Sequence, residues 1–140
     1  NISEESQVKQ ERLQEQSRDS IATLQNDKKM QKLKRKAIHK RVRKNVTGRT
    51  DRPRVAVFKS SQHIYAQIID DSSHTTIVSE SDLKLTTGTK TEKATLVGEN
   101  LAKKAIDKKV KAIIFDRGGF KYHGRVASLA EGLRKGGLEF

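Results

Sequence analysis

The chain has 140 residues, no cysteine and a formal net charge of +13 at pH 7. This length predicts one domain with at most an added segment. The lack of cysteine excludes disulfides and thiolate metal sites, and no apolar run approaches the ~18 residues of a membrane-spanning helix. The strong positive charge favours a polyanionic partner such as nucleic acid.

Residues 1–27 form a polar segment that is acidic, unlike the rest of the chain. It holds six acidic and three basic side chains, a net charge of −3. Its few apolar residues form no continuous helical stripe. We interpret the segment either as an exposed helix or as a disordered tail that orders on a partner. Its negative charge argues against direct contact with nucleic acid.

Residues 28–54 hold thirteen cationic side chains and a single acid, so that +12 of charge lies in one fifth of the chain. Apolar residues recur here at helical spacing, which predicts a helix over Lys28–Lys44 with Asp27 as its N-cap. Gly48 and Pro53 then end the helix. We interpret 28–54 as a basic arm that binds a polyanion; a solvated charged face is the alternative.

Residues 55–140 are predicted to form a globular domain, because the apolar residues concentrate after the arm. Three short runs rich in β-branched and aromatic residues, 54–59, 64–69 and 75–79, have the composition of strands. The segments between them are only four and five residues long. Connections this short favour an antiparallel meander.

A helix and a fourth strand follow the meander. Thr89 and Glu92 have the spacing of a capping box at the start of this helix. Ala112–Phe115 is a continuous apolar run, which predicts a strand buried on both faces. A last helix is closed by Gly136 and Gly137. The order is helix, three strands, helix, strand, helix, and the crossover helix predicts that the fourth strand is parallel to a neighbour. The fold class is therefore α/β, with an α+β-like mixed sheet.

The Gly-rich stretch Asp116–Arg125 leaves the C-terminal end of the predicted fourth strand, where ligands bind in open α/β sheets. Gly118 and Gly119 permit close approach of the backbone to a partner. Tyr122 and His123 offer rings for an unpaired base, or hydrogen bonds for a phosphate or 2′-hydroxyl. We interpret the stretch as a nucleic-acid contact; a flexible loop with its aromatic residues in the core is the alternative.

A weaker candidate surface lies at the turn Lys59–His63 and along the strand after it. Tyr65 and Gln67 share one face of that strand by alternation, so this polar sheet face is placed to meet RNA. A solvated face of an antiparallel sheet accounts for the same pattern.

Enzyme chemistry finds little support in the sequence. Asp70, Asp71 and Asp116 at strand ends are candidates for a metal-dependent nuclease site, although acids at such positions are more often turn formers. The four histidines show no i, i+4 pairing, and neither a nucleophile elbow nor a Walker motif occurs. We predict that the chain is not an enzyme and has no cofactor or metal site.

Three stretches resemble the family of large-subunit ribosomal protein eighteen, in its bacterial form. They are RPRVAVFKS from Arg52, HIYAQIIDD from His63 and FDRGGFKYHGRV from Phe115, and the similarity extends from about Lys32 to Phe140. The resemblance implies a mixed α/β sheet with helices packed on it. It also implies a constituent of the large ribosomal subunit that binds 5S rRNA and helps to attach it to 23S-type rRNA. The implied partners include neighbouring large-subunit proteins, but no membrane and no small-molecule substrate.

The same resemblance places the RNA contacts in the arm, in the first hairpin and in the Gly-rich loop. The predicted RNA-binding residues are Arg35, Lys36, His39, Lys40, Arg41, Arg43, Lys44, Arg49, Arg52, Arg54, Lys59, Ser60, Ser61, His63, Tyr65, Arg117, Gly118, Gly119, Tyr122, His123 and Arg125. The short bacterial form lacks the segment before about residue 31. The bacterial-type match predicts a bacterial cytoplasmic ribosome, and the added segment gives a plastid or mitochondrial one as the alternative. A non-specific nucleic-acid chaperone is the other functional alternative beside the nuclease.

Overall fold

The computed structural model describes residues 2–140 and contains three helices and a four-stranded sheet within that range. This confirms the predicted α/β class and the predicted order of elements. In chain order the elements are α1 (Ile2–Arg43), β1 (Arg54–Lys59), β2 (Ile64–Asp70), β3 (Thr75–Ser81), α2 (Lys90–Asp107), β4 (Ile114–Asp116) and α3 (Arg125–Lys135). The chain forms two compact units, one that ends at Ala37 and one that extends from Ile38 to Phe140.

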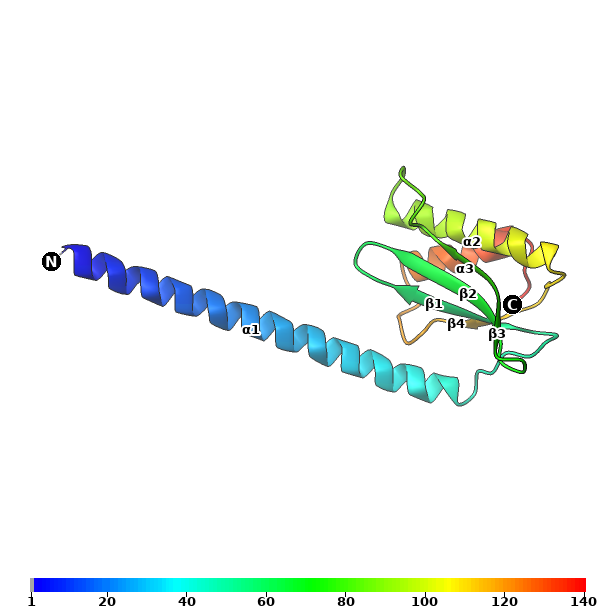
Figure 1. Ribbon diagram of the computed structural model, residues 1–140, viewed down its shortest axis with the longest axis horizontal. Coiled ribbons are helices and arrows are strands. Elements are labelled where there is room, and N and C mark those ends of the chain that lie inside the picture. The colour runs from blue at the N-terminus through cyan, green and yellow to red at the C-terminus, as the bar shows by residue number, and fades with distance from the viewer. Residues whose placement is uncertain (1) are drawn as a thin grey trace. The chain divides into compact units, whose positions relative to one another are not determined.

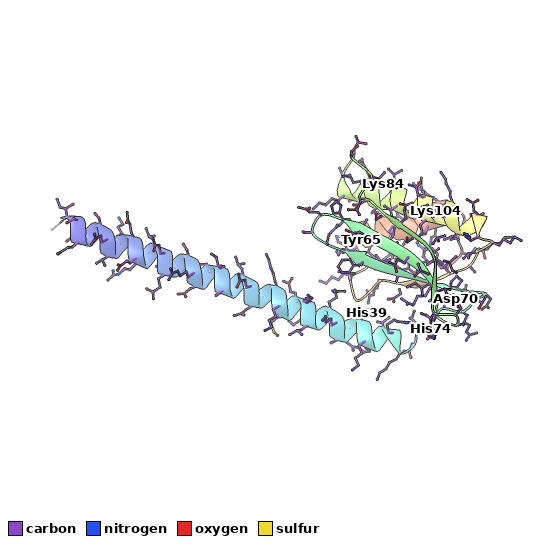
Figure 2. All side chains as sticks on the ribbon, viewed as in Figure 1. His39, Tyr65, Asp70, His74, Lys84 and Lys104 are labelled. Carbon is purple, nitrogen blue, oxygen red and sulfur yellow. The ribbon has the colours of Figure 1, made fainter. Side chains whose placement is uncertain are left out.

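Helix α1 is one continuous helix of 42 residues, and none of them is buried. Figure 2 shows its side chains projecting on all sides. It includes residues from Ile2 onward, so the predicted helix start with Asp27 as N-cap is wrong. Of our two interpretations of the acidic segment, the exposed helix holds for the described residues 2–27. Polar residues such as Gln, Glu and Lys are good helix formers, and the first Gly is Gly48. The first part of α1 has no apolar stripe, which is why periodicity predicted only the part of the helix from Lys28 onward.

The sheet has the strand order β3-β2-β1-β4. β1 is antiparallel to β2, and β2 is antiparallel to β3, as the short connections predict. β4 is parallel to β1, with Val55 opposite Phe115. Helix α2 connects β3 to β4 across the sheet, which confirms the predicted crossover.

The hydrophobic core lies between one face of the sheet and the helices α2 and α3, which cover that face (Figure 1). In β1, Val55 and Val57 lie opposite Ile68 and Ala66 of β2, and all four are buried. The alternate residues of both strands point to the other face, because successive side chains in a strand alternate. The helices add the buried residues Ala94, Val97, Leu101, Ala102, Ala105, Val126, Leu129, Ala130 and Leu133.

The fourth strand differs from the prediction of burial on both faces. β4 comprises Ile114–Asp116 and is an edge strand, so it pairs with β1 alone among the strands. Ile113 and Asp116 are buried, whereas Phe115 is half-buried. The C-terminal residues pack against this edge of the sheet. The Ile113 amide donates to the Glu139 carbonyl at 3.0 Å, and Phe140 stacks on Phe115.

Helices α2 and α3 approach each other closely at two glycines. A Cβ on Gly98 would overlap the carbonyl oxygen of Leu129, and one on Gly132 would overlap the carbonyl oxygen of Thr95. Each glycine therefore allows the other helix's backbone to lie where a side chain would otherwise be.

We expect Gly132→Val to lower the free energy of unfolding by about 2–3 kcal/mol, because a side chain forced into packed backbone strains the core. Urea denaturation measures this change. Glu131→Val places the same β-branched residue at the neighbouring, exposed position of α3 and controls for helix propensity. Equal losses in both variants would show that the close approach contributes nothing to stability.

Candidate nucleic-acid interface

The buried arginine Arg54 organises the point where the arm joins the domain. It begins β1, and strand pairing places it beside the ends of β2 and β4. Its Nε and Nη2 donate to the two carboxylate oxygens of Asp71 at 3.0 and 3.1 Å, and its Nη1 donates to Asp116 Oδ2 at 3.1 Å. The planar guanidinium thus binds Asp71 through two hydrogen bonds and Asp116 through one, and it holds both carboxylates in place.

The same two carboxylates contact the end of α1 and the segment after it. His39 Nε2 lies 3.4 Å from Asp116 Oδ2, and Arg43 Nη2 lies 3.6 Å from Asp71 Oδ1. The amide of Gly48 donates to Asp71 Oδ2 at 2.7 Å. Figure 2 labels His39 on the last part of α1. The arm is therefore attached to the domain at three positions between residues 39 and 48.

The charges within this network stabilise each other. Hydrogen bonds from Arg54 lower the pKa of Asp71, with further contributions from the Gly48 amide and from Arg43, against the opposing effect of burial. Burial works against the charge of Arg54, but the bonds and charges of Asp71 and Asp116 outweigh it and raise its pKa. Arg54 thus serves the domain's own packing, and we no longer include it among the proposed RNA contacts.

The lowered pKa of Asp71 predicts a loss of stability in acid. In the unfolded chain the Asp71 carboxylate has a pKa near the ordinary value of 3.8, whereas in the folded chain it takes up its proton only at lower pH. The stabilisation is therefore complete above the unfolded-state pKa and decreases as the pH falls through the folded-state pKa. We expect Asp71→Asn to flatten the pH dependence of the unfolding free energy between pH 6 and pH 3. Asp51→Asn, at an exposed acid, should leave that dependence as it is in the unmodified chain.

The Gly-rich loop between β4 and α3 is shaped by glycines with positive φ. Gly118 and Gly119 have φ values of 63° and 78°. The Gly118 amide donates to Asp116 Oδ1 at 2.9 Å, and a Cβ on Gly118 would lie 2.5 Å from the carbonyl oxygen of Val57. Gly118 is buried and its close backbone approach is to β1 of its own sheet, so we no longer include it among the proposed RNA contacts.

Arg125 joins this loop to the first hairpin. Its Nη2 donates to the Ser60 carbonyl at 2.7 Å, and its Nη1 donates to the His63 carbonyl at 3.4 Å. Lys90 at the start of α2 also donates to the carbonyl of Ser61. The turn between β1 and β2 is therefore held against the N-terminal ends of both domain helices. Burial and the nearby charge of Arg125 lower the pKa of Lys59 beside this turn.

Comparison with known proteins identifies the family of this chain. The family model described as "Ribosomal L18 of archaea, bacteria, mitoch. and chloroplast" matches residues 26–140. The chain belongs to this family. It is 54% identical over 110 residues to the proteins named "Large ribosomal subunit protein uL18" of Bacillus cereus (strain G9842) and Bacillus mycoides (strain KBAB4). Each alignment covers 76% of this chain and 92% of the relative, which confirms the resemblance seen in the sequence motifs.

The L18-family chain presents most of the predicted RNA-binding residues at its surface. The exposed residues are Lys36, Lys40, Arg41, Lys44, Arg49, Arg52, Ser61, Tyr122 and His123. Half-buried are Arg35, His39, Arg43, Lys59, Ser60, His63, Tyr65, Arg117, Gly119 and Arg125. Only Arg54 and Gly118 of the predicted set are buried. We therefore keep the exposed and half-buried residues as the candidate interface.

Phe58, which is absent from the predicted RNA-binding residues, lies on the sheet face away from α2 and α3. Its side chain is 50% exposed, and its ring centroid lies 6.1 Å from that of Tyr65 and 6.0 Å from that of Phe120. The alternation with buried Val55 and Val57 is the signal that predicts this outward position. Tyr65 and Gln67 share the same face, as their spacing predicts.

The strand-end acids are engaged by donors of the protein itself. Asp70 accepts hydrogen bonds from the Thr50 hydroxyl and the Ser72 amide, and Asp71 and Asp116 bind Arg54. Within residues 2–140 no group of three or more His, Asp or Glu side chains is placed to hold a metal ion. In the same range no helix combines the length and apolar content needed to cross a membrane.

Proposed function

We propose that this L18-family chain is a non-enzymatic constituent of the large ribosomal subunit that binds 5S rRNA and helps to attach it to 23S-type rRNA. One observation carries the proposal: the Gly-rich loop is bonded to both other basic elements. Asp116 at its start contacts His39 of the arm, and Arg125 at its end contacts the hairpin turn. Three elements that are separate in the sequence are thereby held together as one interface.

The arm supplies charge to this interface, and the loop supplies groups that distinguish one RNA from another. Exposed lysines and arginines such as Lys40 and Arg41 bind phosphates without regard to sequence. The exposed side chains of Tyr122 and His123 reach unpaired bases or 2′-hydroxyls. The bacterial source of the relatives supports a bacterial cytoplasmic ribosome; the family description also covers mitochondria and chloroplasts, the alternative location.

Filter binding to 5S rRNA and to a scrambled RNA of equal length, at the same moderate salt concentration, tests the proposal. We expect tighter binding to 5S rRNA, because only that RNA presents bases that match the loop while both present phosphates. Equal affinity for both RNAs would overturn the proposal in favour of a general nucleic-acid chaperone.

We expect Tyr122→Ala to weaken binding to 5S rRNA by about tenfold, the loss of one stacked base, and to change binding to the scrambled RNA much less. Tyr122 is 46% exposed, so its ring is available to a base. Leu83→Ala, at a residue 56% exposed in the segment after β3, is the matched control and should leave both affinities unchanged. Equal losses on both RNAs would remove Tyr122 from the selective part of the interface.

A further inference from the structure

We propose that Asp116 is a positioning residue that couples the arm to the Gly-rich loop, so that the two elements meet RNA in one fixed arrangement. The inference deepens the proposed function and rests on it. Asp116 ends β4, and its side chain has no exposed surface. It therefore acts on RNA only through the residues that it holds.

The two oxygens of Asp116 serve different elements of the interface. Oδ1 accepts a hydrogen bond from the Gly118 amide at 2.9 Å, inside the loop. Oδ2 accepts from Arg54 Nη1 at 3.1 Å and lies 3.4 Å from His39 Nε2 of the arm. One carboxylate at the end of a strand thus contacts both the end of the arm helix and the start of the loop.

Only an acid satisfies both sides of this position. A carboxylate offers acceptors on both oxygens, whereas an asparagine of the same size offers one acceptor and one NH₂ group. If the asparagine oxygen faces the Gly118 amide, its NH₂ faces the donors of Arg54. If it is turned, the loop amide loses its acceptor. Asp116→Asn therefore removes one of the two acceptors, and the loss of the negative charge weakens the bonds at the other, so that both links are affected.

Arg54 extends the attachment of the arm to a second carboxylate. It binds Asp71, which contacts Arg43 and the Gly48 amide. His39 and Arg43 are four residues apart and lie on the same face of the helix. Two contacts one turn apart fix the rotation of the end of α1, and so determine that Lys40 and Arg41 are exposed.

Amide hydrogen exchange without RNA tests the coupling directly. We expect Asp116→Asn to speed exchange at Arg41–Lys44 and at Gly118, while amides of the central strand β2 keep their protection. Asp71→Asn is the matched control, because it frees Arg43 and Gly48 but leaves the bond between Asp116 and Gly118. It should speed exchange at the end of the arm alone. Faster exchange in the loop only, or in neither segment, for Asp116→Asn would overturn the proposal.

A double-mutant cycle tests the consequence for binding to 5S rRNA. We expect Asp116→Asn to lower the affinity about tenfold, because the long side chains of Lys40 and Arg41 must then be ordered when the RNA binds. In a chain with Lys40→Gln and Arg41→Gln the same change should have a smaller effect, because no cations remain at these positions to orient and only the contribution of the loop is lost. An equal loss in both backgrounds would indicate general destabilisation and overturn the proposal.

His39→Gln keeps the test decisive if Asp116→Asn does not fold. It alters the arm side of the link at a residue that is partly exposed, and it leaves the bond to Gly118 in place. We expect faster exchange at the end of α1 only, and an affinity loss that again depends on Lys40 and Arg41. No change in exchange would overturn the coupling. Because exchange needs no RNA, equal affinity for 5S and scrambled RNA would overturn the proposed function alone.

Discussion

Raising the salt concentration from 50 to 200 mM is expected to weaken binding to 5S rRNA by about 10³–10⁵-fold. The arm between residues 28 and 54 holds thirteen cations and one acid, and most of these cations are exposed. Contact with roughly 6–10 phosphates releases a similar number of counterions, which gives this steep dependence. Filter binding across a series of salt concentrations measures it, and a weak dependence would show that the arm does not carry the phosphate contacts.

Charge-removal variants then assign the salt dependence to the arm. We expect a variant with Lys36→Gln, Lys40→Gln and Arg41→Gln to reduce the slope of log affinity against log salt by about three, one for each phosphate contact. The matched control replaces three exposed lysines on and after α2. These are Lys103, Lys108 and Lys111. The control removes the same net charge, so equal slopes for the two variants would mean that only the overall charge matters.

The features predicted well from the sequence are those with a local cause. The capping box at Thr89 and Glu92 is present with both of its reciprocal bonds, because its spacing alone brings the partners together. The short connections between strands left no topology but a meander. Gly136 follows the last residue of α3, as predicted. Each of these patterns is decided within a few residues, so a single sequence suffices.

The features that were missed depend on residues far apart in the chain. Arg54 stands in a basic run, and composition alone assigns it to RNA. Its partners Asp71 and Asp116 are 17 and 62 residues away and become neighbours only through strand pairing. Likewise the pattern of Gly118 reveals conformational freedom but not the strand that it approaches. The candidate interface was therefore predictable as a set of segments, whereas the bonds that join them were not.

The buried position of Arg54 predicts that Arg54→Met lowers the free energy of unfolding by about 3–5 kcal/mol. The side chain of Arg54 is 10% exposed and that of Asp116 is 0% exposed. Without the guanidinium, a fully buried carboxylate loses its main cation, and this uncompensated charge is the cause of the loss. Urea denaturation at pH 7 measures the change in unfolding free energy.

Arg52→Met is the matched control, since Arg52 is exposed and lies two residues earlier in the same basic run. We expect it to change the unfolding free energy by less than about 0.5 kcal/mol, as is usual for surface substitutions. In RNA binding Arg52→Met should lower the affinity directly, because Arg52 belongs to the candidate interface, whereas Arg54→Met should act only through the arm that Arg54 helps to hold. The affinities are compared at equal concentrations of folded protein. A loss of affinity for Arg54→Met that exceeds the loss caused by displacement of the arm would return Arg54 to the RNA contacts. A small stability change for Arg54→Met would instead show that Asp116 is compensated by His39 and the Gly118 amide alone.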